Sequence, residues 1–166
     1  MNKLRRLLLI AVVIGIGFWV WTAWFTNPKQ VIKNRLNQVA RLASFEPNEG
    51  AISRLAKIQR LGLLFAEDVQ VMVDIPGYEA HTFSRREEVM QVVMASPRLG
   101  NGLSAQFLDM NIQLGSGDQS ALVELTLEAK INGESDILAQ EMKFTLKKIK
   151  GDWLITRVET VKTLKP

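Results

Sequence analysis

The sequence has no cysteine, one histidine and one tyrosine in 166 residues. The absence of cysteine excludes disulfide bonds, lipoprotein acylation, thiol catalysis and thiolate metal sites. A single histidine without cysteine cannot build a zinc site of a common type, so we expect no metal. The phosphate-binding patterns G-x-x-x-x-G-K-[ST] and G-x-G-x-x-G are also missing, and we expect no cofactor.

One long hydrophobic run, residues 7–25, contains 19 residues without a charge. A helix rises about 1.5 Å per residue, so this run would span roughly 28 Å, close to the hydrocarbon thickness of a bilayer. Basic residues precede it and tryptophans gather towards its end: Lys3, Arg5, Arg6, then Trp19, Trp21 and Trp24. This order is typical of a transmembrane helix with a cytoplasmic N-terminus. We predict an N-terminal membrane anchor at 1–26, retained as a signal-anchor, and a domain at 27–166.

Two alternatives to this topology stay open. A cleaved signal peptide needs a shorter apolar core and small residues before the cut, whereas a cut after Ala23 would put the bulky Trp21 at position −3. The orientation depends on a modest charge difference, because Lys29, Lys33 and Arg35 soon follow the run. We expect a single-pass membrane protein with its C-terminal domain outside the cytoplasm, in the periplasm of a Gram-negative cell.

Positive and negative charges are nearly balanced in the domain. After Phe25 there are 17 acidic residues and 18 lysines and arginines, which gives +1. A domain so close to neutral argues against general nucleic-acid binding. Residues 27–60 nevertheless contain seven basic and two acidic residues. This segment is either a solvated face or a basic surface that contacts anionic lipid head groups.

Hydrophobic periodicity predicts three helices in the first part of the domain. A stripe at i, i+4, i+7 and i+11 from Ile32 predicts a helix over 28–44. A second helix is expected from Pro47-Asn48 to Gly62, with Ile52, Leu55 and Ile58 on its inner face. A third is expected over 84–95, where Ser84 and Glu87 have capping-box spacing.

Alternating patterns predict strands in the rest. A short strand is expected over 69–73, followed by longer strands over 104–114, 123–131, 138–147 and 153–163. In the first long strand we expect one apolar face made of Leu108, Met110, Ile112 and Leu114. Asn132-Gly133 predicts a type I′ hairpin turn. Helices followed by antiparallel strands indicate an α+β domain whose helices cover one side of a curved sheet.

Three segments resemble the nuclear transport factor 2-like superfamily, which includes SnoaL-like and ketosteroid isomerase-like proteins: LFAEDVQVMVDIPG, SRREEV and GDWLITRVET. The resemblance extends over about 45–164. It implies a cone-shaped domain of three helices packed on a curved, mainly antiparallel sheet, with a ligand pocket between them. Members include enzymes, binding modules and scaffolds, so the fold does not determine the function.

The resemblance implies one candidate catalytic residue, Asp74, near the place of the general base in ketosteroid isomerase-like members. The donors that such chemistry needs are missing, since the first helix has no tyrosine and Thr145 falls near the late-strand carboxyl. Asp before Ile-Pro-Gly is also ordinary turn chemistry. Tyr78, His81 and Gln140 are candidate ligand-binding residues, although a loop histidine usually faces solvent and a strand rim or a bulge explains Gln140 more readily than a pocket lining.

The leading functional hypothesis is a membrane-anchored extracytoplasmic module that binds or scaffolds without catalysis. Its expected partners are the lipid bilayer and either a membrane protein or an apolar small molecule. The alternative is a small-molecule isomerase or cyclase that uses a pocket carboxylate, Asp74. A third hypothesis is a homodimer formed through the sheet. An enclosed cavity around Asp74, Tyr78 and His81 would favour the enzyme, whereas a cavity filled by apolar side chains would favour the binding module.

Overall fold

A computed structural model describes residues 12, 14, 27–74, 79–95, 101–134 and 137–161. The chain divides into two compact units, Met1–Val31 and Ile32–Pro166. The predicted anchor lies outside the described residues, apart from Val12 and Ile14. Within the described part of the chain, no helix is both long and apolar enough to cross a membrane.

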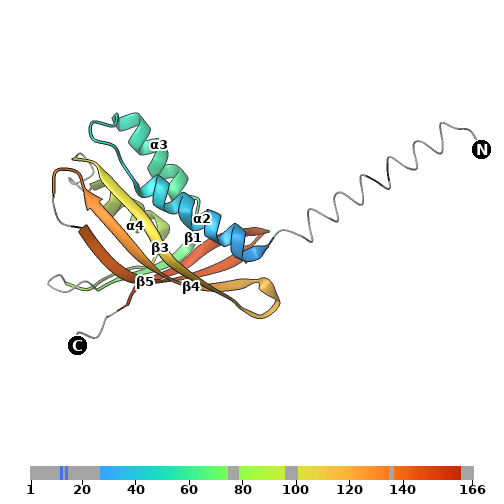
Figure 1. The fold of residues 1–166 in the computed structure, drawn as a ribbon. Coiled ribbons are helices and arrows are strands. Elements are labelled where there is room, and N and C mark those ends of the chain that lie inside the picture. Colours follow the sequence, from blue (N-terminus) through green and yellow to red (C-terminus); the bar gives the residue numbers. More distant parts are fainter. Residues whose placement is uncertain are drawn as a thin grey trace, which may run out of the picture. The chain divides into compact units, whose positions relative to one another are not determined.

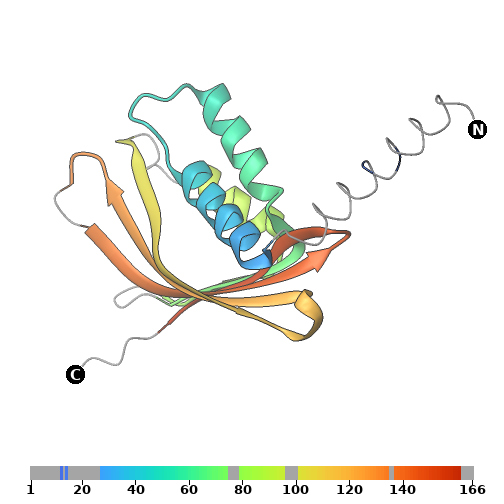
Figure 2. The ribbon, with the colours of Figure 1, turned by 45° about the vertical axis from the view of Figure 1, so that its right-hand side comes forward.

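The first described helix is α2, Pro28–Ala43, and it matches the prediction to within one residue. The Asn27 side chain caps it by accepting a 3.0 Å hydrogen bond from the Lys29 backbone N–H. Its buried stripe is Ile32, Leu36, Val39 and Ala40. The helix lies on the concave side of the sheet (Figure 2).

The second helix, α3, covers Ala51–Gly62 and starts later than predicted. Pro47-Asn48 forms a turn in which Asn48 has a positive φ of 64°, so the helix cannot begin there. The predicted inner face is wrong at two of three positions, because Ile52 is 87% exposed and Leu55 47% exposed. At about 100° per residue, Ile52 and Ile58 point roughly 120° apart. The buried face is instead formed by Ile58, Leu61 and Gly62.

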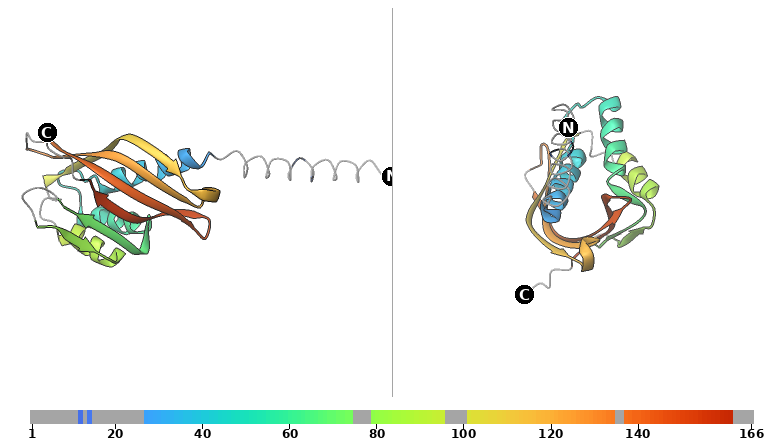
Figure 3. Two further views of the ribbon diagram at one scale, coloured as in Figure 1. Left: turned by 90° about the horizontal axis from the view of Figure 1, so that it is seen from below. Right: turned by 90° about the vertical axis from the view of Figure 1, so that its right-hand side faces the viewer.

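The third helix, α4, covers Arg86–Ala95 and lies beside α3 (Figure 3). The predicted capping box is displaced by one residue, since the Ser84 N–H donates to Oε2 of Glu88, not of Glu87, at 3.0 Å. This N–H and the Arg85 side chain lower the pKa of Glu88. No residue of α4 is fully buried, although its sequence is rich in valine and methionine.

Six strands form one curved sheet in the order β2-β1-β6-β5-β4-β3 (Figure 1). They are β1 (Phe65–Val73), β2 (His81–Phe83), β3 (Leu103–Leu114), β4 (Ser120–Ile131), β5 (Ile137–Ile149) and β6 (Asp152–Thr160). All neighbouring pairs are antiparallel except β1 and β6, which are parallel. The short edge strand β2 was not predicted. The α+β class, with three helices on a mainly antiparallel sheet, is confirmed.

A β-bulge in β3 corrects the face predicted for that strand. The register with β4 shifts between Leu108 and Asn111, and Asp109 has a positive φ of 52°. One extra residue in a strand switches the inward-facing side chains, here from odd-numbered to even-numbered residues. Ala105 and Phe107 therefore face the helices before the bulge, Met110 and Ile112 face them after it, and the predicted inward residue Leu108 is exposed.

The type I′ turn is found at a different hairpin from the one predicted. At the predicted turn Gly133 has a positive φ but Asn132 does not, so the turn is not of type I′. The turn is closed by a 3.1 Å hydrogen bond from the Glu134 N–H to Ile131 O. The two positive φ values that a type I′ turn needs occur at Lys150 (52°) and Gly151 (93°). Ile149 and Asp152 pair directly on either side of that two-residue turn.

Aliphatic side chains fill the space between helices and sheet. The six largest fully buried side chains come from two layers, namely Ile32 and Leu36 on α2 and Val69, Val123, Leu146 and Ile155 on the sheet. Among the described residues, no polar or charged residue is buried. Burial of such side chains stabilises a fold by about 1.5–3 kcal/mol each, before the entropy of the unfolded chain is counted.

Candidate functional site

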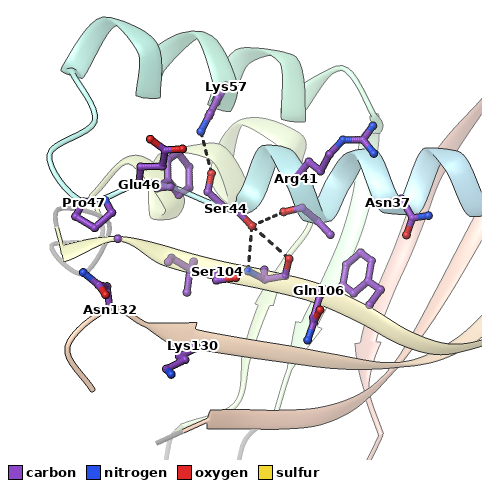
Figure 4. A pocket seen from close by; sticks show the side chains of 16 residues that line it. Asn37, Arg41, Ser44, Glu46, Pro47, Lys57, Ser104, Gln106, Lys130 and Asn132 are labelled. Carbon is purple, nitrogen blue, oxygen red and sulfur yellow. Dashed lines mark hydrogen bonds between the residues drawn. The ribbon is translucent and has the colours of Figure 1, made fainter. Parts of the chain in front are cut away.

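A surface groove of about 810 Å³ lies between the C-terminal half of α2 and the first half of β3 (Figure 4). Its polar lining includes Asn37, Arg41, Ser44, Lys57, Gln106 and Lys130. Phe45, Leu103 and Phe107 contribute apolar surface. We call this site the α2–β3 groove. Its volume is within the range of small-ligand and peptide sites, about 300–1,000 Å³.

The segment that follows α2 pairs with the outer edge of β3. Phe45 and Leu103 exchange two backbone hydrogen bonds, of 2.7 and 2.8 Å. Next to them, Ser44 Oγ accepts a 3.0 Å bond from the Ala105 N–H and donates to Ala40 O at 2.8 Å (Figure 4). Ser44 and Phe45, which follow α2, thus already cover the start of the β3 edge.

Lys57 of α3 holds this segment in place. Its Nζ donates to Ser44 O at 3.1 Å and to Glu49 Oε2 at 2.9 Å, and stands 5.7 Å from the centre of the Phe45 ring. Two neighbours lower the pKa of Glu49. The larger effect is from the Ser53 hydroxyl, which donates to Glu49 Oε1 at 2.6 Å, and the next is from Lys57. Sequence analysis missed this cluster, although Glu49, Ser53 and Lys57 follow each other at intervals of four residues.

Positive charge dominates the α2–β3 groove. Its lining contains three cations (Arg41, Lys57 and Lys130) and one carboxylate, Glu46. Lys57 pairs with Glu49, whereas Arg41 and Lys130 have no ion-pair partner in the described part of the chain. Figure 4 shows Arg41 projecting from α2 on one side of β3 and Lys130 on the other side.

A second groove, of about 510 Å³, runs between α3 and α4 and is mainly apolar. Leu55, Ile58, Leu63, Met90 and Met94 line it. Leu63 is 68% exposed and Met94 49% exposed, so much of this surface meets solvent. Exposed apolar surface of this kind often marks an interaction site.

The predicted site residues on β1 and β2 lie near the end of their hairpin. Asp74 follows β1, and Thr160 Oγ1 accepts from its backbone N–H at 2.8 Å and donates to its carbonyl at 3.1 Å. His81 starts β2, is exposed and stacks at 6.4 Å on the Phe83 ring. Tyr78 lies outside the described residues. None of the described grooves includes Asp74 or His81 in its lining.

Gln140 lies in β5 and is half-buried. Its Nε2 donates to two backbone carbonyls, those of Glu141 and Val161, each at 3.0 Å. The side chain thereby links β5 to the residue after β6, which matches the strand-rim alternative. For the described ranges, no group of three histidine, aspartate or glutamate side chains could hold a metal ion.

No family model and no curated protein matches the sequence. Solved structures do match. An NTF2-like protein with a cystatin-like fold from Novosphingobium aromaticivorans superposes with a TM-score of 0.62 at 11% identity, over 96% of this chain and 90% of its own. The domain has a nuclear transport factor 2-like fold.

Two further structures show the same fold. An NTF2-like protein of unknown function from Pseudomonas putida has a TM-score of 0.61 at 12% identity, over 81% of this chain and 85% of its own. A protein provisionally named a scytalone dehydratase, from Novosphingobium aromaticivorans, has a TM-score of 0.60 at 18% identity, over 82% and 84% of the two chains. Because one fold hosts many functions, these likenesses do not assign an activity.

Proposed function

We propose that this protein is a membrane-anchored binding or scaffold module without catalytic activity, whose domain lies outside the cytoplasm. The observation that supports it best is the apolar character of the buried side chains in the described part of the chain. Enzyme pockets combine enclosed space with a few converging polar groups. Here the concave side of the sheet holds Leu36, Val123 and Leu146, and no buried polar residue occurs among the described ones. The open grooves are on the outer surface, where a partner can reach them.

The membrane part of the proposal rests on the uncharged run at 7–25 and its flanking residues. Only Thr26 separates the run from Asn27-Pro28, and α2 begins at Pro28. A connection this short holds the domain within about 10 Å of the bilayer surface. The expected partners are therefore another membrane protein or an apolar molecule that partitions into lipid.

Pull-down of the full-length protein from its native membrane, after chemical cross-linking, tests this function. The protein has no cysteine, so single cysteines placed at exposed positions become unique attachment points for a cross-linker. We expect one membrane protein to be recovered in a fixed ratio. Recovery of the full-length protein alone, together with turnover of a small molecule, would contradict the proposal.

The alternative function is an isomerase-like or cyclase-like enzyme with Asp74 as base. The likeness to a protein provisionally named a dehydratase favours it. Substituting Asp74→Asn in the native host separates the two. A general base contributes about 10²–10⁴-fold to a rate, so an enzyme would lose its function. The binding module retains it, because proton transfer by Asp74 plays no part in its function.

Homodimerisation through the sheet stays a prediction. The outer face has polar cross-strand pairs, including Lys143 with Glu124 at 3.5 Å and the hydrogen-bonded pair Gln106 and Glu128. Such pairs are satisfied within one copy. Sedimentation of the full-length protein in detergent decides this point, and a monomer at every concentration would exclude the dimer.

A further inference from the structure

We propose that the α2–β3 groove receives an extended acidic segment of a partner protein, which pairs with the edge of β3 at Phe107. The proposal rests on the binding function proposed above and specifies its partner. In strand addition, main-chain hydrogen bonds supply affinity and the neighbouring side chains supply selectivity. The edge of β3 and the charges beside it offer both.

The edge of β3 is open for pairing beyond its first residues. β3 is the outermost strand of the sheet, and its pairing groups at Leu103 and Ala105 are already taken by Phe45 and Ser44. Because alternate residues direct their N–H and C=O to the same side, those of Phe107 point to this edge too. No described residue provides a partner for them there.

The length of the open edge favours a short peptide over a second copy of this chain. The bulge at Leu108–Asn111 interrupts the regular ladder directly after Phe107, and it places the exposed Asp109 beside the edge. Bulges and charged residues on an edge strand hinder edge-to-edge pairing of identical sheets. Before the bulge only Phe107 is left to pair, so the segment forms one pair of main-chain hydrogen bonds there, and the side chains of the groove supply its other contacts.

The charges of the groove define the chemistry of the segment. Arg41 and Lys130 flank the β3 edge without ion-pair partners of their own in the described part of the chain (Figure 4). Carboxylates that alternate with apolar residues along a strand all face one side of it, so one such row reaches Arg41 on the α2 side, and only a carboxylate at an intervening position reaches Lys130. The amide side chains of Asn37, Gln106 and Asn132 add further hydrogen-bonding groups. This lining differs from the apolar α3–α4 groove and does not suit an acyl chain.

A peptide titration on the full-length protein in detergent micelles tests the proposal. The probes are fluorescent, end-blocked ten-residue peptides that alternate valine with glutamate or valine with lysine. We expect the glutamate peptide to bind at least about tenfold more tightly at low salt, and the difference to shrink as salt is added. Equal binding of the two peptides, or binding of laurate in place of either peptide, would overturn the proposal.

Backbone methylation distinguishes strand addition from simple charge attraction. We compare two glutamate peptides, one N-methylated at every valine and the other at every glutamate. An added strand presents only one edge to β3, so one methylated peptide loses about tenfold or more in affinity and the other retains it. Equal affinities of the two methylated peptides would refute strand addition.

A matched pair of protein variants locates the site. Arg41 and Arg60 are both exposed arginines in the last turn of a helix, but only Arg41 lines the α2–β3 groove. We expect Arg41→Glu to weaken glutamate-peptide binding by about three- to tenfold and Arg60→Glu to leave it unchanged. Equal effects would place binding elsewhere. A partner recovered from native membranes without any peptide selectivity would remove this inference and leave the anchored binding module standing.

Discussion

The hydroxyl of Ser44 should protect one specific amide at the edge of β3. Its Oγ accepts the Ala105 N–H at 3.0 Å and donates to Ala40 O at 2.8 Å. Ser44→Ala removes these bonds, together with the 3.3 Å contact between Oγ and Ala105 O, and changes little else, because the side chain loses a single atom. Ser44→Thr is the control, since it retains a hydroxyl at the same position.

The expected cost of Ser44→Ala follows from the surroundings of the Ala105 amide. A fully buried donor left without a partner costs about 1–3 kcal/mol. Ala105 is only half-buried, so water reaches part of the site and the cost should be near the lower limit, about 1 kcal/mol. A loss of about 1 kcal/mol makes local opening roughly fivefold more frequent.

Amide hydrogen exchange, read residue by residue by NMR, measures this effect. We expect exchange at Ala105 to become roughly fivefold faster in Ser44→Ala, with Ser44→Thr close to the wild type. Exchange in α4, which has no fully buried residue, should change less, because α4 can open locally without breaking the Ser44 bonds. An unchanged rate at Ala105 in Ser44→Ala would refute the assigned role of the hydroxyl.

Three further predictions concern stability. The pKa of Glu49 is lowered from its ordinary value of 4.5. Its contribution to stability is therefore present above that value and is lost as the pH falls through the folded-state pKa. Thermal unfolding of Glu49→Gln should show lower stability at neutral pH and a weaker dependence of stability on acid pH. Leu146→Ala, at a fully buried position, should cost about 2–5 kcal/mol in urea unfolding. Ile52→Ala, at an 87% exposed position, should change stability by less than about 0.5 kcal/mol, and a larger loss would mean that Ile52 is covered.

Periodic hydrophobic patterns predicted most of the elements correctly. Residues such as Ile32, Leu36 and Val123 repeat at the helical or strand period and are buried as expected. The pattern was ambiguous in β3, because Phe107 and Leu108 are adjacent apolar residues that satisfy opposite alternations. The bulge determines which of the two residues faces inward. It is marked by one residue, Asp109, which has a positive φ. The three-residue β2 is held by pairing to β1 and has no periodic pattern of its own.

The candidate site was harder to predict than the fold. Asp74 was selected by the family resemblance and His81 by residue type, yet their described contacts are those of a strand end and a short edge strand. The α2–β3 groove brings together residues far apart in the chain, such as Arg41, Gln106 and Lys130. Its position depends on how Phe45 meets Leu103, a contact that local sequence patterns do not encode.

The central claim is that residues 7–25 anchor a binding domain in a membrane. Alkaline extraction of native membranes, followed by intact-mass measurement of the protein, tests it most directly. We predict that the protein stays with the lipid pellet and retains the sequence before Asn27. Recovery in the aqueous fraction, with a chain that begins after Ala23, would contradict it.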